Sequence, residues 1–308
     1  MDKKKMIPVN KLGLKLHPRY EYAKDAHERL MAAADAHGIK IIDLTGEQEP
    51  ATVEDCRVVA SIGGDGTLLS AVRSAYPSDT PVWGINVGEL GFLTTSGVNE
   101  IEQHVERLAK GDYQVEPRTM IEGTVSWGEH ETLLVALNDI VLHRQVPGGG
   151  LMALDVELNG RFLAAYEADG LIISTPTGST GYTLSAGGSI LSPTVAALEI
   201  TPVSAHSFSA RSLVVDDSSV LVIRPRLKTE GEVAFALADG QQVAKLVNCP
   251  VRSGKQSADS CRMVVRRSEK TAGFVRFEDV VFSDVLRDKL GWADAAPSNR
   301  LKESPWIP

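Results

Sequence analysis

Apolar and polar residues follow two different periods along this chain of 308 residues. Up to about residue 113, short apolar runs such as Leu12 to Leu16 and Cys56 to Ile62 alternate with segments whose apolar residues recur every three or four positions. The clearest of these segments, residues 19–37 and 99–110, are each followed by a glycine, which commonly stops a helix. Strands that alternate with helices predict a parallel α/β sheet.

After about residue 113 the pattern changes to many short β-type runs. Turn residues such as Asn159-Gly160 and Asp239-Gly240 separate them, and one helix-like piece lies near Gly181 to Leu191. This spacing predicts stacked β-sheets. The pattern of residues from Phe282 to Trp292 predicts a final helix. We therefore expect an α/β plus all-β fold: an α/β domain over residues 1–115, a β-sandwich-like domain over 116–284, and a segment, 285–308, that packs back on the first domain.

The composition is that of a globular protein, with 43% hydrophobic and 23% charged residues. The net charge of −8, with no basic run beyond residues 3–5, argues against general nucleic-acid binding. We find no signal peptide and no apolar stretch of 18 residues, so we expect no membrane span and a cytoplasmic protein. The three cysteines, Cys56, Cys249 and Cys261, are scattered, which argues against a disulfide framework and a structural zinc site.

A glycine-rich loop, IGGDGT, follows the apolar run that ends at Ile62. Gly63, Gly64 and Gly66 lie at the expected carboxyl end of a strand, where open α/β sheets bind ligands. Bare backbone amides and the N-terminus of the next helix would attract phosphate oxygens. The loop matches neither the P-loop nor the dinucleotide-binding pattern of glycines. It therefore predicts a polyphosphate site of another kind.

Asp65 places a carboxylate inside this loop, where it would repel a phosphate. Three roles are open to it. It could hold a Mg²⁺ ion on the phosphates, or it could accept the proton of an attacking hydroxyl. It could also be an ordinary turn residue between two glycines. The position of the complete string directly after a strand favours a functional role.

A second motif runs from Tyr166 to Gly188. It contains a turn at Asp169-Gly170, an apolar strand, and then a series of small and hydroxyl residues that suits a ribose, an adenine edge or a phosphate. The alternative is a polar loop in which Ser179 or Thr180 caps a helix. A nucleophilic serine is disfavoured, because the pattern is not GxSxG and no histidine is placed as its base. The series is Ser174, Thr175, Thr177, Ser179, Thr180, Tyr182 and Ser185.

A third candidate is the polar pair Asn138-Asp139, which interrupts an apolar run from Leu133 to Leu142. Polar side chains inside an apolar strand are costly unless a partner or a ligand satisfies them. The pair therefore indicates either a binding site or a β-bulge or turn.

Together these strings resemble the NAD kinase family. The resemblance covers roughly residues 55–290 and is carried by GGDGT at 63–67, NVGELGFL at 86–93, LND at 137–139, DGLIISTPTGSTGY at 169–182 and DGQ at 239–241. The first string alone is shared with diacylglycerol and sphingosine kinases and, more loosely, with phosphofructokinases. The STPTGSTGY string is the one typical of NAD kinases.

The resemblance implies transfer of a phosphoryl group from ATP or polyphosphate to the 2′-hydroxyl of the adenosine ribose of NAD, with Mg²⁺ as cofactor. Asp65 would be the catalytic base. The first domain would bind the nucleotide donor and the second NAD, in a homodimer or homotetramer with small-molecule substrates only. The implied binding residues are Gly63, Gly64, Gly66, Thr67, Phe92, Asn138, Asp139, Asp169, Thr177, Thr180, Tyr182 and Ser185, and no metal ligand is assigned.

Three other functions compete with this interpretation. A lipid kinase would share the glycine loop, but no cationic or apolar segment suited to a membrane surface accompanies it. A non-catalytic NAD-binding module would not need Asp65. A sugar-phosphate kinase would need further strand–helix units for a second α/β lobe.

Overall fold

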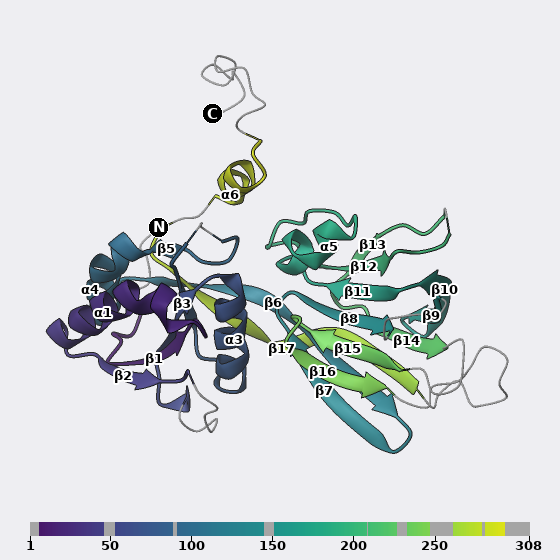
Figure 1. Ribbon diagram of the computed structural model, residues 1–308, viewed down its shortest axis with the longest axis horizontal. Helices are drawn as coiled ribbons and strands as arrows, with labels where there is room; N and C mark the ends of the chain where they lie inside the picture. Colours follow the sequence, from purple (N-terminus) through teal and green to yellow (C-terminus); the bar gives the residue numbers. More distant parts are fainter. Residues whose placement is uncertain are drawn as a thin grey trace, which may run out of the picture.

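The computed structural model describes residues 6–45, 53–88, 91–144, 151–207, 209–226, 233–246, 261–278 and 281–292. Figure 1 shows two lobes side by side: an N-terminal lobe with helices around a sheet, and a β-rich lobe. This arrangement confirms the predicted fold class. The long strands β6 (Gln114–Trp127) and β17 (Cys261–Arg276) run together through both lobes. The boundary near residue 115 therefore stays a prediction.

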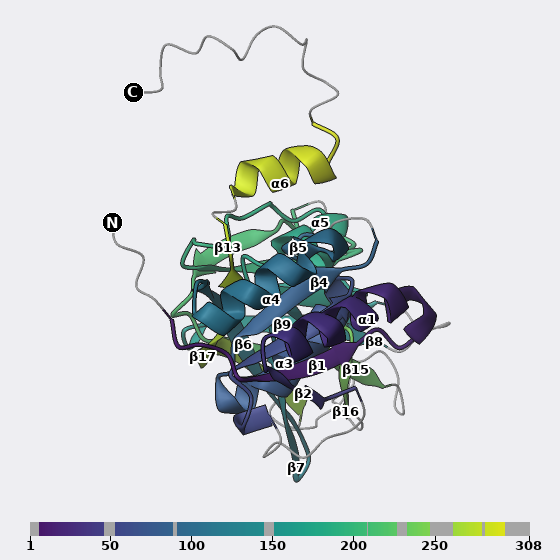
Figure 2. The same cartoon turned by 90° about the vertical axis from the view of Figure 1, so that its left-hand side faces the viewer.

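The N-terminal lobe is a parallel sheet whose strands lie in the order β4-β3-β1-β2. Every residue of β3 is buried, because helices cover both faces of the sheet. Val58, Ala60 and Ile62 pack in one apolar cluster with α1 and α4, whereas Val59 packs in another with α3. Figure 2 shows α1 and α4 next to each other on their face. The elements are β1 (Lys11–Leu16), α1 (Tyr20–Ala36), β2 (Lys40–Asp43), β3 (Val58–Gly63), α3 (Asp65–Ala75), β4 (Val82–Asn86), β5 (Ser96–Gly97) and α4 (Ile101–Lys110).

The β-rich lobe is built from two sheets that face each other across an apolar core. One sheet continues from the N-terminal lobe in the order β10-β9-β14-β17, and the other has the order β13-β12-β11-β8-β15-β16. Leu171 and Ile173 of the second sheet and Leu154 and Val156 of the first belong to the same buried cluster. The remaining strands are β7 (His130–Ala136), β8 (Asp139–Arg144), β9 (Met152–Leu158), β10 (Arg161–Ala168), β11 (Gly170–Ser174), β12 (Ala197–Val203), β13 (Leu213–Asp216), β14 (Leu221–Arg226), β15 (Ala234–Ala238) and β16 (Gln242–Leu246).

Local predictions hold well for turns and less well for one helix. Asn159-Gly160 and Asp239-Gly240 are turns with positive φ at both residues, as their sequences indicate. The helix expected near Gly181 to Leu191 is only α5 (Tyr182–Ser185), because Gly187 adopts φ +87° and ends it.

The predicted last helix is present, and one cysteine differs from its prediction. The last helix is α6 (Phe282–Lys289), and residues 293–308 lie outside the described part of the chain. Cys261 is disulfide-bonded, which the scattered cysteines did not predict. Among the described residues, no helix combines the length and the apolar character that a membrane crossing requires.

Candidate active site

The glycine loop joins β3 to α3 and exposes its backbone to a large cavity. Gly64 caps α3, and a Cβ atom on Gly64 or Gly66 would meet no atom within 4 Å. Gly63 is different, because a Cβ there would lie 2.3 Å from Oγ1 of Thr67. The first glycine therefore makes room for the buried threonine, and the other two leave the start of the helix open to a ligand.

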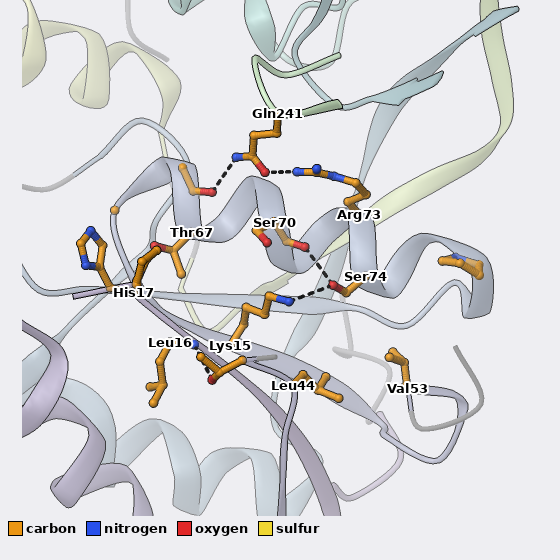
Figure 3. Close-up of a pocket in the computed structure, with 15 residues that line it drawn as sticks. Lys15, Leu16, His17, Leu44, Val53, Thr67, Ser70, Arg73, Ser74 and Gln241 are labelled. Atoms are coloured by element: carbon orange, nitrogen blue, oxygen red, sulfur yellow. Dashed lines mark hydrogen bonds between the residues drawn. The ribbon is translucent and has the colours of Figure 1, made fainter. Parts of the chain in front are cut away.

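The cavity beside this loop, which we call the glycine-loop cavity, has a volume of about 1030 Å³. Figure 3 shows two basic side chains in its wall, Lys15 from β1 and Arg73 from α3. Lys15 Nζ lies 3.5 Å from the hydroxyl of Ser74, and burial followed by the charge of Arg73 lowers the lysine pKa. The lining residues are Lys15, Leu16, His17, Pro18, Leu44, Thr45, Val53, Gly64, Gly66, Thr67, Ser70, Arg73, Ser74, Pro77 and Gln241.

Lys15 and Arg73 were missed by the sequence analysis, although each carries a signal. Lys15 is a charged residue near the end of an apolar strand, KLGLKL. Arg73 follows Gly66 by seven residues, about two helical turns, so both lie on one face of α3. Gln241 of the β-rich lobe contacts both Gly66 and Arg73. Its amide N–H donates to the Gly66 carbonyl at 3.0 Å, and its Oε1 accepts a hydrogen bond from Arg73.

Asp65 is the first residue of α3. It does not line the glycine-loop cavity, and its carboxylate contacts the segment after β4. Oδ2 accepts the backbone N–H of Phe92 at 3.0 Å, and Oδ1 accepts that of Leu93 at 3.2 Å. A Cβ on Gly91 would lie 2.0 Å from Oδ1, so only glycine fits there. The two amides fix the orientation of the carboxylate, and each oxygen keeps a lone pair for a further donor.

The pair Asn138-Asp139 lies where two strands meet rather than inside one strand. β7 ends at Ala136 and β8 begins at Asp139, so the bulge-or-turn alternative describes the backbone here, and the binding-site interpretation stays a prediction. The Asp239 carboxylate accepts the N–H groups of Leu137 at 3.0 Å, Asn138 at 2.8 Å and Asp139 at 3.2 Å. This half-buried carboxylate organises the connection from about 100 residues away.

Asp139 and Asp239 border a second cavity of about 530 Å³, which we call the carboxylate cavity. Asp139 is only 6% exposed, and burial, reinforced by the charge of Asp239, raises its pKa to about 7. Oδ1 of Asn138 is buried without a hydrogen-bond partner among the described residues. The wall thus combines one unsatisfied amide oxygen with a carboxyl group that a ligand could contact. Its lining residues are Leu69, Asn138, Asp139, Val141, His143, Tyr182, Phe235, Leu237, Asp239 and Gly240.

The segment after β11 is held against this connection by its own small residues. The Thr175 hydroxyl donates to the Leu137 carbonyl at 2.5 Å, and the Asn138 carbonyl accepts the N–H of Thr175 at 2.9 Å. A Cβ on Gly178 would lie 2.2 Å from the Asn138 carbonyl oxygen, so the two backbones cross in contact. Much of the hydroxyl-rich series is therefore structural.

The helix-cap interpretation of this segment is wrong. Neither the short 3₁₀ turn Gly178–Thr180 nor α5 receives a side-chain cap. Ser179 instead donates to the Pro176 carbonyl at 2.7 Å and accepts the N–H of Leu191 at 2.9 Å. Thr177 and Thr180 line a third, smaller cavity together with Phe92.

Two residues of the predicted site, Asp169 and Ser185, do not line the cavities described above. Asp169 precedes β11, and the register pairs Gly170 with His143 but Ser174 with Asp139, so Asp169 lies more than about 13 Å along the strands from Asp139. It forms an ion pair with Arg144, Nε to Oδ1, at 2.8 Å. Ser185 is exposed at the end of α5 and lines none of the three cavities.

In the described ranges, no group of three or more His, Cys, Asp or Glu side chains could hold a metal ion by itself. Mg²⁺ does not require such a group, because it keeps several waters and is usually bound through one or two carboxylates together with substrate phosphates. Asp65 is the carboxylate of the glycine loop and would be the candidate ligand there.

Two families of domains match this sequence. The ATP-NAD kinase N-terminal domain matches residues 9–113, and the ATP-NAD kinase C-terminal domain matches residues 137–264. The NAD kinase of Sulfurimonas denitrificans is 31% identical over 295 residues, which cover 93% of this chain and 98% of that protein. The NAD kinase of Gemmatimonas aurantiaca is 39% identical over 237 residues, which cover 75% and 76%.

Solved structures share the fold. Yeast NADH kinase complexed with NADH superposes with a TM-score of 0.81 at 23% identity, over 96% of this chain and 90% of that one. An NAD kinase from Archaeoglobus fulgidus in complex with ATP gives a TM-score of 0.71 at 20% identity, over 93% and 100%.

Proposed function

Because the chain belongs to the NAD kinase family, we propose that it transfers a phosphoryl group from ATP or polyphosphate to the 2′-hydroxyl of the adenosine ribose of NAD, giving NADP. The position of Asp65 carries this proposal. Its neighbours Gly64 and Gly66 line the glycine-loop cavity, while Phe92, whose N–H it accepts, lines the cavity with Thr177 and Thr180. Asp65 itself lines neither cavity, but its neighbours on both sides do, and this supports a carboxylate that acts between the donor phosphates and the acceptor hydroxyl.

The donor phosphates fit the glycine-loop cavity. Backbone amides of the loop and the positive end of α3 would hold the phosphate oxygens. Lys15 and Arg73 supply two cationic groups in the same wall, where charge-assisted hydrogen bonds to phosphate are strong. Mg²⁺, when bound, would neutralise the charge that develops on the transferred group. Polyphosphate fits the same features, because none of them reads a base.

The acceptor would occupy the carboxylate cavity and the third cavity. The unsatisfied Asn138 Oδ1 and the Asp139 carboxyl can bind ribose hydroxyls or an exocyclic amine. Asp65 takes the proton of the 2′-hydroxyl while the 2′-oxygen forms its bond to the γ-phosphorus and the bond from that phosphorus to the donor's bridging oxygen breaks. The Phe92 and Leu93 amides keep the carboxylate aligned for that transfer.

An enzyme assay tests the function. Purified protein is incubated with NAD or NADH and with ATP or polyphosphate, and NADP(H) is measured with a specific dehydrogenase. NADH is included because the yeast neighbour is an NADH kinase. A parallel reaction with diacylglycerol and labelled ATP tests the lipid-kinase alternative. Failure to form NADP or NADPH with either donor would refute the proposal.

Asp65→Asn tests the base. We expect kcat to fall by about 10²–10⁴-fold, the usual contribution of a general base, with little change in KM for NAD. Asp35→Asn, an exposed carboxylate on α1, is the matched control. Near wild-type turnover in Asp65→Asn would remove this residue from the chemistry.

Further parts of the proposal rest on the resemblance. They are the Mg²⁺ requirement, a cytoplasmic location, a homodimer or homotetramer, and acceptor contacts from Asp169 and Ser185. Chelation of divalent ions should abolish turnover, and light scattering of the purified protein measures the oligomeric state.

A further inference from the structure

Two arginines from neighbouring strands lie buried beneath the third cavity. Arg118 of β6 is 8% exposed and Arg276 of β17 is 7% exposed. The strands are antiparallel, and Phe274 lies opposite Glu116. Because side chains alternate along a strand, Glu116, Arg118, Phe274 and Arg276 share one face of this pair. The fold thus places two guanidinium groups next to each other.

One carboxylate serves both arginines. Glu116 Oε1 lies 2.9 Å from Arg118 Nη2, and Oε2 lies 2.6 Å from Arg276 Nε. The guanidinium carbons lie 5.5 and 5.6 Å from the centre of the Phe274 ring. Arg118 Nε and Arg276 Nη1 find no hydrogen-bond partner in the described part of the chain. Among the residues that the structure describes, the two buried cations pair with a single anion, so one positive charge is not compensated.

The electrostatics of the cluster agree with this shortage of negative charge. Burial lowers the pKa of Arg118, the charge of Glu116 opposes the effect, and the charge of Arg276 adds to it. Burial would raise the pKa of Glu116, but the charges of Arg276 and Arg118 outweigh it, and the pKa lies below its usual value. A second anion near the guanidinium groups would relieve their mutual repulsion.

The cavity above the arginines, which we call the arginine cavity, has a volume of about 180 Å³. That is room for about six waters at roughly 30 Å³ each, and less than the roughly 300–1,000 Å³ of pockets that enclose a whole drug-sized ligand. Thr177 and Thr180 place polar groups in its wall, and Phe282 and Val285 of α6 border it. Its charged lining residues are Glu116, Arg118 and Arg276, so the wall carries a net positive charge.

We propose that Arg118 and Arg276, with Thr177 and Thr180, form a binding subsite for a phosphate group. Guanidinium groups bind phosphate oxygens through two parallel N–H bonds. The Thr177 hydroxyl can donate to a remaining oxygen, and the Thr180 hydroxyl, which donates to the Thr177 carbonyl at 3.4 Å, would turn to do the same. The phosphate comes either from free inorganic phosphate or from a dinucleotide bound in the neighbouring cavities. Only the dinucleotide as the source of the phosphate rests on the proposed function.

Arg276→Met is the decisive variant, because it leaves Glu116 paired with Arg118 and the cluster neutral. Calorimetry on the full chain measures the affinity for inorganic phosphate, NAD and NADP. Loss of the charge-assisted hydrogen bonds should lower the affinity for the ligand that uses the subsite about 10–100-fold. Arg266→Met removes an arginine from the same strand whose side chain is 61% exposed, and is the control with unchanged affinities. If Arg276→Met does not fold, Arg276→Lys tests the loss of the planar guanidinium group. We then expect the ligand affinity to fall about 10-fold.

The outcomes separate the two sources. Weaker binding of inorganic phosphate in the variant supports the subsite with a free anion, and weaker binding of NAD or NADP alone supports it with a dinucleotide phosphate. Wild-type affinity for all three ligands overturns the subsite, even if the wild type forms NADP. If the wild type forms no NADP but its phosphate binding depends on Arg276, the proposed function fails and the subsite stands.

Discussion

Asp139 makes the stability of this protein depend on pH in a direction opposite to that of a salt-bridged aspartate. Burial and the neighbouring Asp239 raise the pKa of Asp139 to about 7 in the folded protein, from 3.8 for an exposed aspartate. Between these two values the folded protein holds a proton that the unfolded chain releases. The free energy of unfolding must therefore fall as the pH rises through this window.

The magnitude follows from the difference in pKa. About three units at 1.36 kcal/mol each give a penalty of about 4 kcal/mol above pH 7, and only about 1.5 kcal/mol of it is present near pH 5. Asp139→Asn has nearly the shape of the protonated residue but cannot ionise. The variant should therefore gain stability relative to the wild type as pH rises, by about 3 kcal/mol between pH 5 and about pH 8.5.

Chemical denaturation of both proteins at a series of pH values measures this difference. The trend with pH is the informative quantity, because groups that do not interact with Asp139 titrate alike in both proteins and cancel. Asp35→Asn on the exposed face of α1 should show no such trend. A stability difference between Asp139→Asn and the wild type that stays constant from about pH 5 to pH 8.5 would refute the raised pKa and the burial argument behind it.

Two further substitutions test the arrangement around the loop. In Gly91→Ala the new Cβ would lie 2.0 Å from Oδ1 of Asp65 and should displace that carboxylate. We expect kcat to fall about 10²-fold, with little change in KM for ATP. Unchanged turnover would contradict the close contact. Arg73→Met should raise KM for ATP about 10-fold and leave KM for NAD unchanged, as steady-state kinetics would show. Arg73 also binds Gln241, so Gln241→Ala is its control: an equal rise in KM would assign the effect to the contact between the lobes.

Local sequence determined the elements and the loop. The strands and helices of the first lobe, the glycine loop and the turn at Asn159-Gly160 were predicted because each depends on a few consecutive residues: an apolar period, a strand end or a backbone with positive φ. The motif strings also identified the family, and with it Asp65 as a candidate base.

The tertiary structure decided which groups meet. Phe92 and Leu93 hold Asp65 from 27 and 28 positions away, and Arg276 meets Glu116 across 160 positions. The Asp239 carboxylate gathers the amides of residues 137–139 at the connection between β7 and β8. Periodicity records only whether a position faces the core, whereas these contacts depend on how distant strands pack side by side. The chain therefore carried its chemistry in short motifs, and the packing of its two lobes fixed where each charge lies.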